Sequence, residues 1–236
     1  MTPHAGGPVI PNFGHASSCV TENRFFCTDW VRAHWDDTLQ PALLQHLRLS
    51  AIAVSIGFVL AFALALVAYR VRRLDHPIGI ASDFLYTIPS LALFQLLVPI
   101  TGLSVTTVEV ALVSYTLLIL YRNTLEGLRG VSEDVREAAR GMGMTGTQML
   151  LRVELPLALP LVFAGIRIAA IFVIATATIA AIAGGGGLGE IIVNQASYRL
   201  AGVVAASLWV SFLAFAAAGL LAIARRALSP RGARGG

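Results

Sequence analysis

Long hydrophobic runs, separated by charged segments, dominate the pattern of this sequence. A helix of about 20 apolar residues crosses a bilayer core of about 30 Å, so runs of this length predict membrane-spanning helices. We expect five spans, of which the second begins a little before Asp83 and the third ends at Tyr121. The runs that carry them are residues 50–69, 84–108, 108–121, about 156–183 and 200–224.

The composition of the chain agrees with this pattern. Of the 236 residues, 56% are hydrophobic and 13% are charged, whereas about 25% of the residues in a typical soluble domain are charged. The sequence therefore predicts an all-α integral membrane protein with five transmembrane helices. An odd number of spans places the two termini on opposite sides of the membrane.

The positions of arginine indicate which side is cytoplasmic. In the five-span arrangement, twelve of the 17 arginines fall on one side, within residues 70–73, 122–152 and 225–234, and four fall on the other. Because cytoplasmic loops carry an excess of basic residues, we expect the C-terminus inside the cell and the N-terminus outside. A count of four or six spans would destroy this separation.

Three parts of the chain follow from this topology. They are an extracytoplasmic N-terminal segment 1–45, a transmembrane domain 46–228 and a cytoplasmic tail 229–236. No cleavable signal peptide is expected, because the first 45 residues are of mixed polarity. Two cysteines at short spacing outside the cell are expected to form a disulfide, with free thiols as the alternative. They are Cys19 and Cys27.

The charged segment between spans three and four, residues 122–156, carries signals for two short helices. Ser132 is a good N-cap for the first helix, and Gly143 helps to end it. Thr145 and Gln148 form a T-x-x-Q capping box for the second, which we expect to end near Pro156.

Its length favours docking to a partner over the alternative of a solvated connector, because ordinary helix connections have about 2–8 residues. Met142, Met144 and Met149 add a soft apolar surface of the kind found at interfaces.

The stretch "EAARGMGMTGTQMLLRVELP" resembles the EAA signature of ABC-importer permeases, the binding-protein-dependent family. The resemblance covers about residues 42–228 and implies a type I importer fold with a five-helix core. In that family the signature forms coupling helices that sit in a cleft of a cytoplasmic ATPase subunit. The matching positions are Glu137, Ala138, Ala139, Gly143, Val153, Leu155 and Pro156, with Val153 standing where Ile is commoner.

The resemblance also implies the partners. The chain contains no lysine, which excludes the phosphate-binding loop G-x-x-x-x-G-K-[ST]. We therefore expect ATP and magnesium on a separate ATPase, and no cofactor or metal site in this chain. The other expected partners are a second permease chain, identical or homologous, an extracytoplasmic solute-binding protein and the lipid of the bacterial cell membrane. The net charge of +4 needs no nucleic-acid partner, because the arginines follow the topology.

Two further stretches, "YTIPSLALFQLLVPITGLS" and "LPLALPLVFAGIRIAA", are similar to permeases for glycine betaine, choline, carnitine and related osmoprotectants. The element "GGGGLG" is shared with methionine and phosphonate importers and distinguishes substrates poorly. A quaternary-ammonium osmoprotectant is therefore the expected cargo, and methionine or another small organic solute is the alternative. A membrane enzyme, for which the sequence has no H-E-x-x-H or G-x-S-x-G motif, and a passive channel or scaffold are the other classes.

Candidate gate or translocation residues lie in the second and fourth spans. Four successive glycines are costly in conformational entropy, which favours a constrained element at the outer gate over a plain helix end. Arg167 is expected to pair with Asp83, with snorkelling to the surface as the alternative. The candidates are Tyr86, Pro89, Ser90, Arg167, Gly184, Gly185, Gly186 and Gly187.

Aromatic side chains recognise quaternary ammonium groups through cation–π attraction. Phe84, Tyr86 and Phe94 are candidates in the second span, with packing or lipid contact as the alternative. Glu109 could attract cations, but we expect it to be interfacial and solvated. Trp30 and Trp35 are expected to anchor an amphipathic helix at the outer membrane surface.

Overall fold

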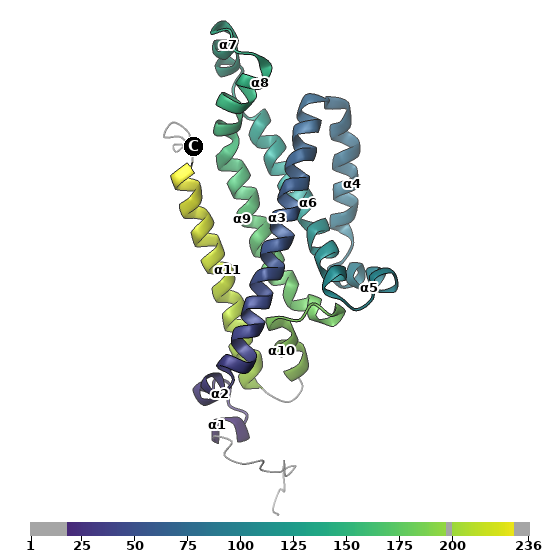
Figure 1. Ribbon diagram of the computed structural model, residues 1–236, viewed down its shortest axis with the longest axis vertical. Coiled ribbons are helices and arrows are strands. Elements are labelled where there is room, and N and C mark those ends of the chain that lie inside the picture. Colours follow the sequence, from purple (N-terminus) through teal and green to yellow (C-terminus); the bar gives the residue numbers. More distant parts are fainter. Residues whose placement is uncertain (1–17, 197–199, 229–236) are drawn as a thin grey trace, which may run out of the picture.

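The computed structural model describes residues 18–196 and 200–228, and all the regular elements within them are helical (Figure 1). Residues 1–17 of the expected N-terminal segment and the expected tail 229–236 lie outside the described residues. The elements are α1 Ser18–Thr21, α2 Thr28–Ala33, η1 Trp35–Leu39, α3 Gln40–Arg70, η2 Arg72–Leu74, α4 Asp75–Thr87, α5 Ser90–Thr101, α6 Val105–Arg129, α7 Glu133–Gly141, α8 Gly146–Met149, η3 Leu150–Glu154, α9 Leu155–Ile179, η4 Ala180–Ala183, α10 Leu188–Gln195 and α11 Leu200–Leu228.

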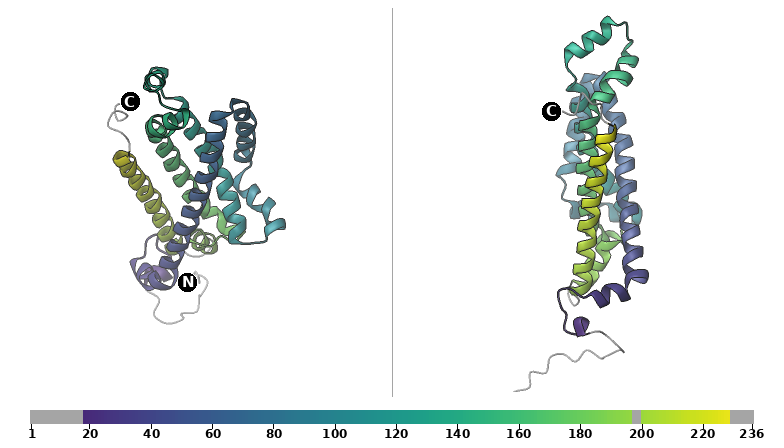
Figure 2. Two further views of the ribbon diagram at one scale, coloured as in Figure 1. Left: turned by 45° about the horizontal axis from the view of Figure 1, so that its top comes forward. Right: turned by 90° about the vertical axis from the view of Figure 1, so that its left-hand side faces the viewer.

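Four long helices, α3, α6, α9 and α11, form an elongated bundle whose two ends carry different short elements (Figures 1 and 2). Helices α7 and α8 project at one end, which we call the α7 end. Helices α1, α2 and α10 lie at the other, which we call the α2 end. Four continuous helical stretches are long and apolar enough to cross a membrane, and the bent pair α4–α5 brings the number to five. The expected five-helix fold is thereby confirmed, with one span broken.

The second span differs from the straight run predicted over residues 84–108. Helix α4 begins at Asp75, and the path turns by 96° before α5. Pro89 causes the break, because proline has no N–H and pushes the preceding residue out of the helical region. Ile88 accordingly has ψ 125°, and Ser90 is the first residue of α5.

Small residues allow the bundle helices to approach closely, as is usual where helices pack within lipid. Ala53, Ala61 and Ala65 on α3 are fully buried. A Cβ at Gly57 would lie 1.8 Å from Thr116 Oγ1 on α6, so only glycine fits there. Helices α3 and α6 run in the same direction and form the centre of the bundle with α9 (Figure 1).

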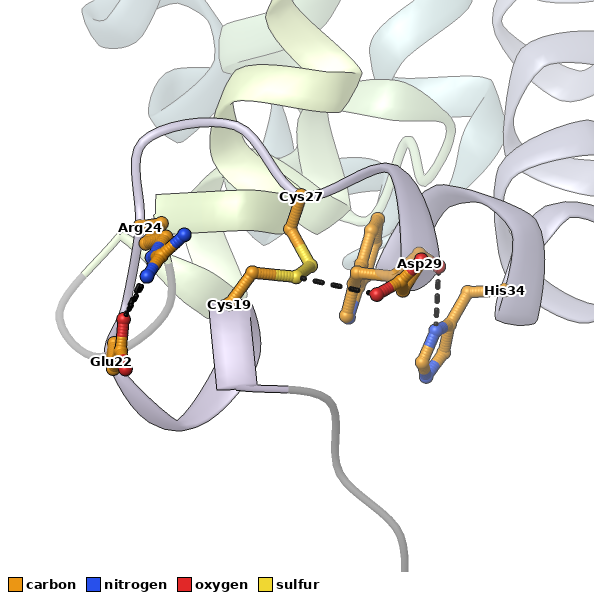
Figure 3. Close-up of a disulfide and its surroundings, with 7 residues drawn as sticks. Cys19, Glu22, Arg24, Cys27, Asp29 and His34 are labelled. Carbon is orange, nitrogen blue, oxygen red and sulfur yellow. Dashed lines mark hydrogen bonds and ion pairs between the residues drawn. A yellow bond between two sulfur atoms is a disulfide. The ribbon is translucent and has the colours of Figure 1, made fainter.

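The N-terminal elements form a cap on the α2 end. A disulfide joins Cys19 to Cys27, whose Cα atoms lie 5.6 Å apart (Figure 3). Trp30 is 2% exposed and packs with residues of α10 and α11. Asn23 Oδ1 accepts a hydrogen bond of 2.8 Å from the backbone N–H of Leu200, at the start of α11. The cap therefore fastens the first and last spans together.

Candidate functional site

Helix α7 is a short helix with well-defined ends. Ser132 occupies the predicted N-cap position with extended backbone, although its side chain makes no capping bond. At the other end, Gly143 adopts φ +76°, and the N–H groups of Gly143 and Met144 donate to the carbonyls of Arg140 and Ala139. This pair of bonds is a Schellman motif, which explains the need for glycine at position 143.

The predicted capping box begins α8. Thr145 Oγ1 accepts from the Gln148 N–H, and Gln148 Oε1 accepts from the Thr145 N–H. The helix that follows does not end near Pro156 as expected. It continues through the π-helical turn η3 into α9, so that residues 146–183 form one helical stretch of 38 residues. Pro156 therefore lies inside this stretch, directly after the π-helical turn η3, and lacks the N–H that a residue in a helix interior normally donates.

Glu154 anchors α7 to the bundle. Its side chain is only 2% exposed, and Oε1 accepts hydrogen bonds from the Tyr69 hydroxyl at 2.6 Å and from Arg136 Nε at 2.9 Å. Tyr69 lies at the end of α3, Arg136 on α7 and Glu154 just before α9. One buried carboxylate therefore joins the projecting helix to two spans.

Arg136 extends this network, because its guanidinium has three acceptors. Besides Glu154, it donates to the Leu128 carbonyl at 2.9 Å and to Glu133 at 3.2 Å. Arg140 also donates to Glu133, at 2.8 Å. The Arg140 guanidinium, followed by that of Arg136, lowers the pKa of the exposed Glu133 carboxyl. Three of the five charged residues of α7, Glu133, Arg136 and Arg140, are thus linked by ion pairs.

A second network lies beside the first. Asp75 accepts from Tyr121 Oη at 2.7 Å and from Arg129 at 2.7 Å, which ties α4 to the end of α6. A cleft of about 740 Å³ separates the two networks and is lined by residues of both. Its lining is Tyr69, Arg72, Asp75, Arg129, Glu133, Arg136, Arg140, Met149 and Glu154. Seven of the nine lining residues are charged, so the cleft between the two networks is strongly polar.

The EAA residues divide between the two faces of this segment. Ala139 is buried, with 1% of its surface exposed, whereas Glu137, Ala138 and Gly143 are exposed. Met142 is 69% exposed at the turn after α7. Val153, Leu155 and Pro156 are half-buried where α8 merges into α9. The outer face of α7 and its turn, comprising Val135, Glu137, Ala138 and Met142, is available to a partner.

The four glycines form a tight loop at the α2 end. Gly184, Gly186 and Gly187 have φ of +87°, +68° and +71°, a region that favours glycine. A Cβ on Gly184 would lie 2.8 Å from the backbone of Leu103, so the loop lies against the turn between α5 and α6. The backbone of the loop is thus constrained, and its place at an outer gate stays a prediction.

Two residues that the sequence did not single out hold this loop. The Gln45 side chain donates to the Gly185 carbonyl at 3.1 Å and accepts from the Gly187 N–H at 3.1 Å. His46 is fully buried beside Gly187, and its Nε2 lies 3.0 Å from the Ile174 carbonyl oxygen. The only sequence signal for their role was the presence of two adjacent polar residues near the start of an apolar helix.

Two expectations about charged residues were wrong. Asp83 pairs with Arg122 at 2.6 Å, and Arg167 is exposed, because α4 packs on α6 rather than on α9. Glu109 is not solvated, since both of its carboxylate oxygens are buried without a hydrogen-bond partner in the described part of the chain. Helix α6 begins at Val105, which places Glu109 inside the helix rather than at its margin.

Residues 44–233 match the family described as "Binding-protein-dependent transport system inner membrane component". The chain belongs to this family. Its members are transport subunits of ABC importers and work in general with an ATPase and a binding protein. The EAA segment and the broken second span described above are therefore features of an inner-membrane permease.

Several curated permeases with named solutes are similar to this chain. The chain is 34% identical over 192 residues to the glycine betaine/carnitine/choline transport system permease protein OpuCB of Bacillus subtilis, covering 81% of this chain and 88% of that protein. It is 36% identical over 189 residues to the choline transport system permease protein OpuBB of the same organism, covering 80% and 87%. It is 38% identical over 196 residues to the osmoprotectant import permease protein OsmW of Salmonella typhimurium, covering 80% and 91%.

Solved structures confirm the type I permease fold. A chain of the inward-facing MetNI methionine ABC transporter superposes with a TM-score of 0.75 at 20% identity, covering 81% of this chain and 96% of that one. A chain of an amino acid ABC transporter crystallised with histidines gives a TM-score of 0.66 at 20% identity, covering 80% and 95%. At this level of identity the likeness concerns the fold alone.

The candidate aromatic residues of the second span occupy three different environments in this permease. Phe94 is 1% exposed in the core. Phe84 is 67% exposed and makes no ring contact within the described ranges. Tyr86 is 38% exposed and lies near two other rings, Tyr115 at 6.2 Å and Phe172 at 5.8 Å between centroids. Only Tyr86 thus combines an accessible ring with aromatic neighbours from two other helices.

Proposed function

We propose that this chain is the non-catalytic membrane subunit of an ATP-driven importer for a quaternary-ammonium osmoprotectant of the glycine betaine, choline or carnitine class. The observation that carries the proposal is the set of relatives at 34–38% identity over about 80% of the chain, two of them named as permeases for choline or for glycine betaine, carnitine and choline, and one as an osmoprotectant import permease. A solute-binding protein would deliver the cargo. The methionine alternative rests on structural likeness at only 20% identity.

In this proposal the α7 end faces the cytoplasm and docks on an ATPase, which holds ATP and magnesium. Closure of two ATPase subunits moves α7 and α8. The hydrogen bonds of Glu154 transmit this movement to α3, through Tyr69, and to α9, which follows Glu154 in sequence. A second permease chain, identical or homologous, completes the path between inward-open and outward-open states. The spacing of the EAA residues and the exposed outer face of α7 support this arrangement.

Uptake measurements on the reconstituted transporter test the identity of the transported solute. We expect proteoliposomes that contain this chain, its ATPase and its binding protein to accumulate radiolabelled choline, glycine betaine or carnitine when ATP is inside. Accumulation of methionine without any quaternary ammonium solute would overturn the proposal in favour of the alternative.

Two substitutions test the coupling role. Glu137→Arg reverses the charge on the exposed face of α7, and Gly143→Val places a β-branched residue at φ +76°. Both are expected to abolish uptake and co-purification of the ATPase, while membrane insertion is kept. Retained ATPase binding in both variants would contradict the assignment of this segment.

A further inference from the structure

We propose that Tyr86, with Tyr115 and Phe172 beside it, forms a transient binding site for the quaternary ammonium group at the break between α4 and α5. This inference rests on the proposed function and adds the location and chemistry of a site within the membrane domain. Three observations carry it: the arrangement of the rings, the end of α4 and the nature of the cation.

The three rings come from three different helices and meet in a triangle. The centroid distances are 6.2 Å for Tyr86–Tyr115 and 5.8 Å for both Tyr86–Phe172 and Tyr115–Phe172. The plane of Tyr86 is inclined by 36° to that of Phe172 and meets that of Tyr115 edge-on at 77°, so a cation would lie over the exposed face of Tyr86, within about 6 Å of its centroid, while the other two rings hold Tyr86 in place. Tyr115 is 2% exposed and lies behind, whereas Tyr86 is 38% exposed and offers the accessible ring.

The backbone break adds a negative electrostatic contribution at the same place. Tyr86 lies in the last turn of α4, whose C-terminal end carries a partial negative charge of about half an electron. Pro89 has no N–H for the carbonyl of Leu85, which loses its helical partner. Broken backbone at membrane depth is tolerated where it is buried in protein or lines a polar path. The Tyr115 hydroxyl donates to the Ile88 carbonyl at 2.5 Å, which ties α6 to the break.

The chemistry of the solute explains why rings would be used here. A quaternary ammonium nitrogen carries no proton, so it cannot donate a hydrogen bond to a side-chain or backbone acceptor. Its charge still has to be stabilised when it leaves water, and an aromatic face together with a helix C-terminus can do this. The site therefore lowers the barrier for a cation that crosses the domain.

Replacement of one ring tests the proposal. In the reconstituted complex with saturating binding protein, Tyr86→Leu is expected to lower maximal choline uptake roughly tenfold. Tyr86→Phe keeps the ring and should retain uptake. Phe84→Leu is the matched control, because Phe84 lies on the same helix and is exposed without ring contacts, and it should behave as the unmodified chain.

A graded series separates cation binding from packing. Phenylalanines with increasing ring fluorination at position 86 keep the shape of the side chain and weaken its negative face. Uptake is expected to fall stepwise along this series, while co-purification of the ATPase stays constant. Uptake that is independent of fluorination, or a Tyr86→Phe variant as impaired as Tyr86→Leu, would overturn the site and leave the proposed function intact. An unmodified transporter that takes up no quaternary ammonium solute would overturn both.

Discussion

Removal of the charge at Glu154 should detach α7 from the bundle. Glu154→Gln keeps the size of the side chain, but the neutral amide replaces a carboxylate that accepts from both Tyr69 and Arg136. The amide oxygen can still accept, but Arg136, with only 15% of its side chain exposed, loses its buried counter-charge and keeps the exposed Glu133 as its one charged acceptor besides the Leu128 carbonyl.

The size of the effect follows from burial. Hydrogen bonds to a charged group contribute about 1.5–3 kcal/mol each, and removal of one partner of a buried ion pair costs about 3–5 kcal/mol. We expect a loss of about 3 kcal/mol in the free energy of unfolding. By the usual scaling for chains of about 150–250 residues, this lowers the melting temperature by roughly 6–12 °C.

Thermal unfolding of the purified chain in lipid nanodiscs measures this loss. Glu133→Gln is the matched control, because this carboxylate also pairs with Arg136 but is 55% exposed, and exposed pairs contribute about 0–1 kcal/mol. In the assembled transporter, Glu154→Gln should also lower uptake more than ATP hydrolysis, since α7 could move without moving α3. Equal melting temperatures for the two variants would refute the reasoning.

Three other predictions concern the α2 end, and each is checked by thermal unfolding together with solute uptake. Gly186→Ala places a Cβ at φ +68° and 2.3 Å from the Gln45 side chain, so it should lower the free energy of unfolding by about 1–3 kcal/mol. Gly146→Ala is its control, because a Cβ there meets open space and should leave the stability unchanged. Gln45→Leu removes two hydrogen bonds from the glycine loop and should cost about 1–3 kcal/mol. Replacing Cys19 and Cys27 by serine opens a loop closed at a separation of 8 residues and should cost about 2–3 kcal/mol. If any of these three variants has the same melting temperature as the unmodified chain, the role given to the replaced residue is wrong.

The spans and the coupling helices could be predicted from local signals. Apolar length alone marks a membrane helix, and the arrangement Thr145–Gln148 marks a helix start wherever it occurs. Both signals depend on residues close together in sequence, and the structure confirms the capping box and the end of α7 near Gly143.

Features that depend on direction or on distant contacts could not be predicted in the same way. The run 84–108 is uncharged throughout and mostly apolar, so its composition does not reveal the 96° turn at Pro89. Glu154 resembles any acid of a charged loop, although Leu150 and Ala158, one turn away on either side, are both buried. That period of four was the available signal for a buried carboxylate. The partners of Asp83 and Tyr86 depend on which helices become neighbours. The local sequence pattern carries no information about that arrangement.

The central claim is that the outer face of α7 and its turn meet a separate ATPase. Site-specific crosslinking from Met142→Cys, 69% exposed at that turn, measures this contact in the purified transporter. Leu103→Cys, 67% exposed in the turn between α5 and α6 beside the glycine loop, is the matched control. We predict that a bifunctional thiol reagent links the ATPase to position 142 and not to position 103. Crosslinking from position 103 alone, or from neither position in a complex that hydrolyses ATP, would contradict the account.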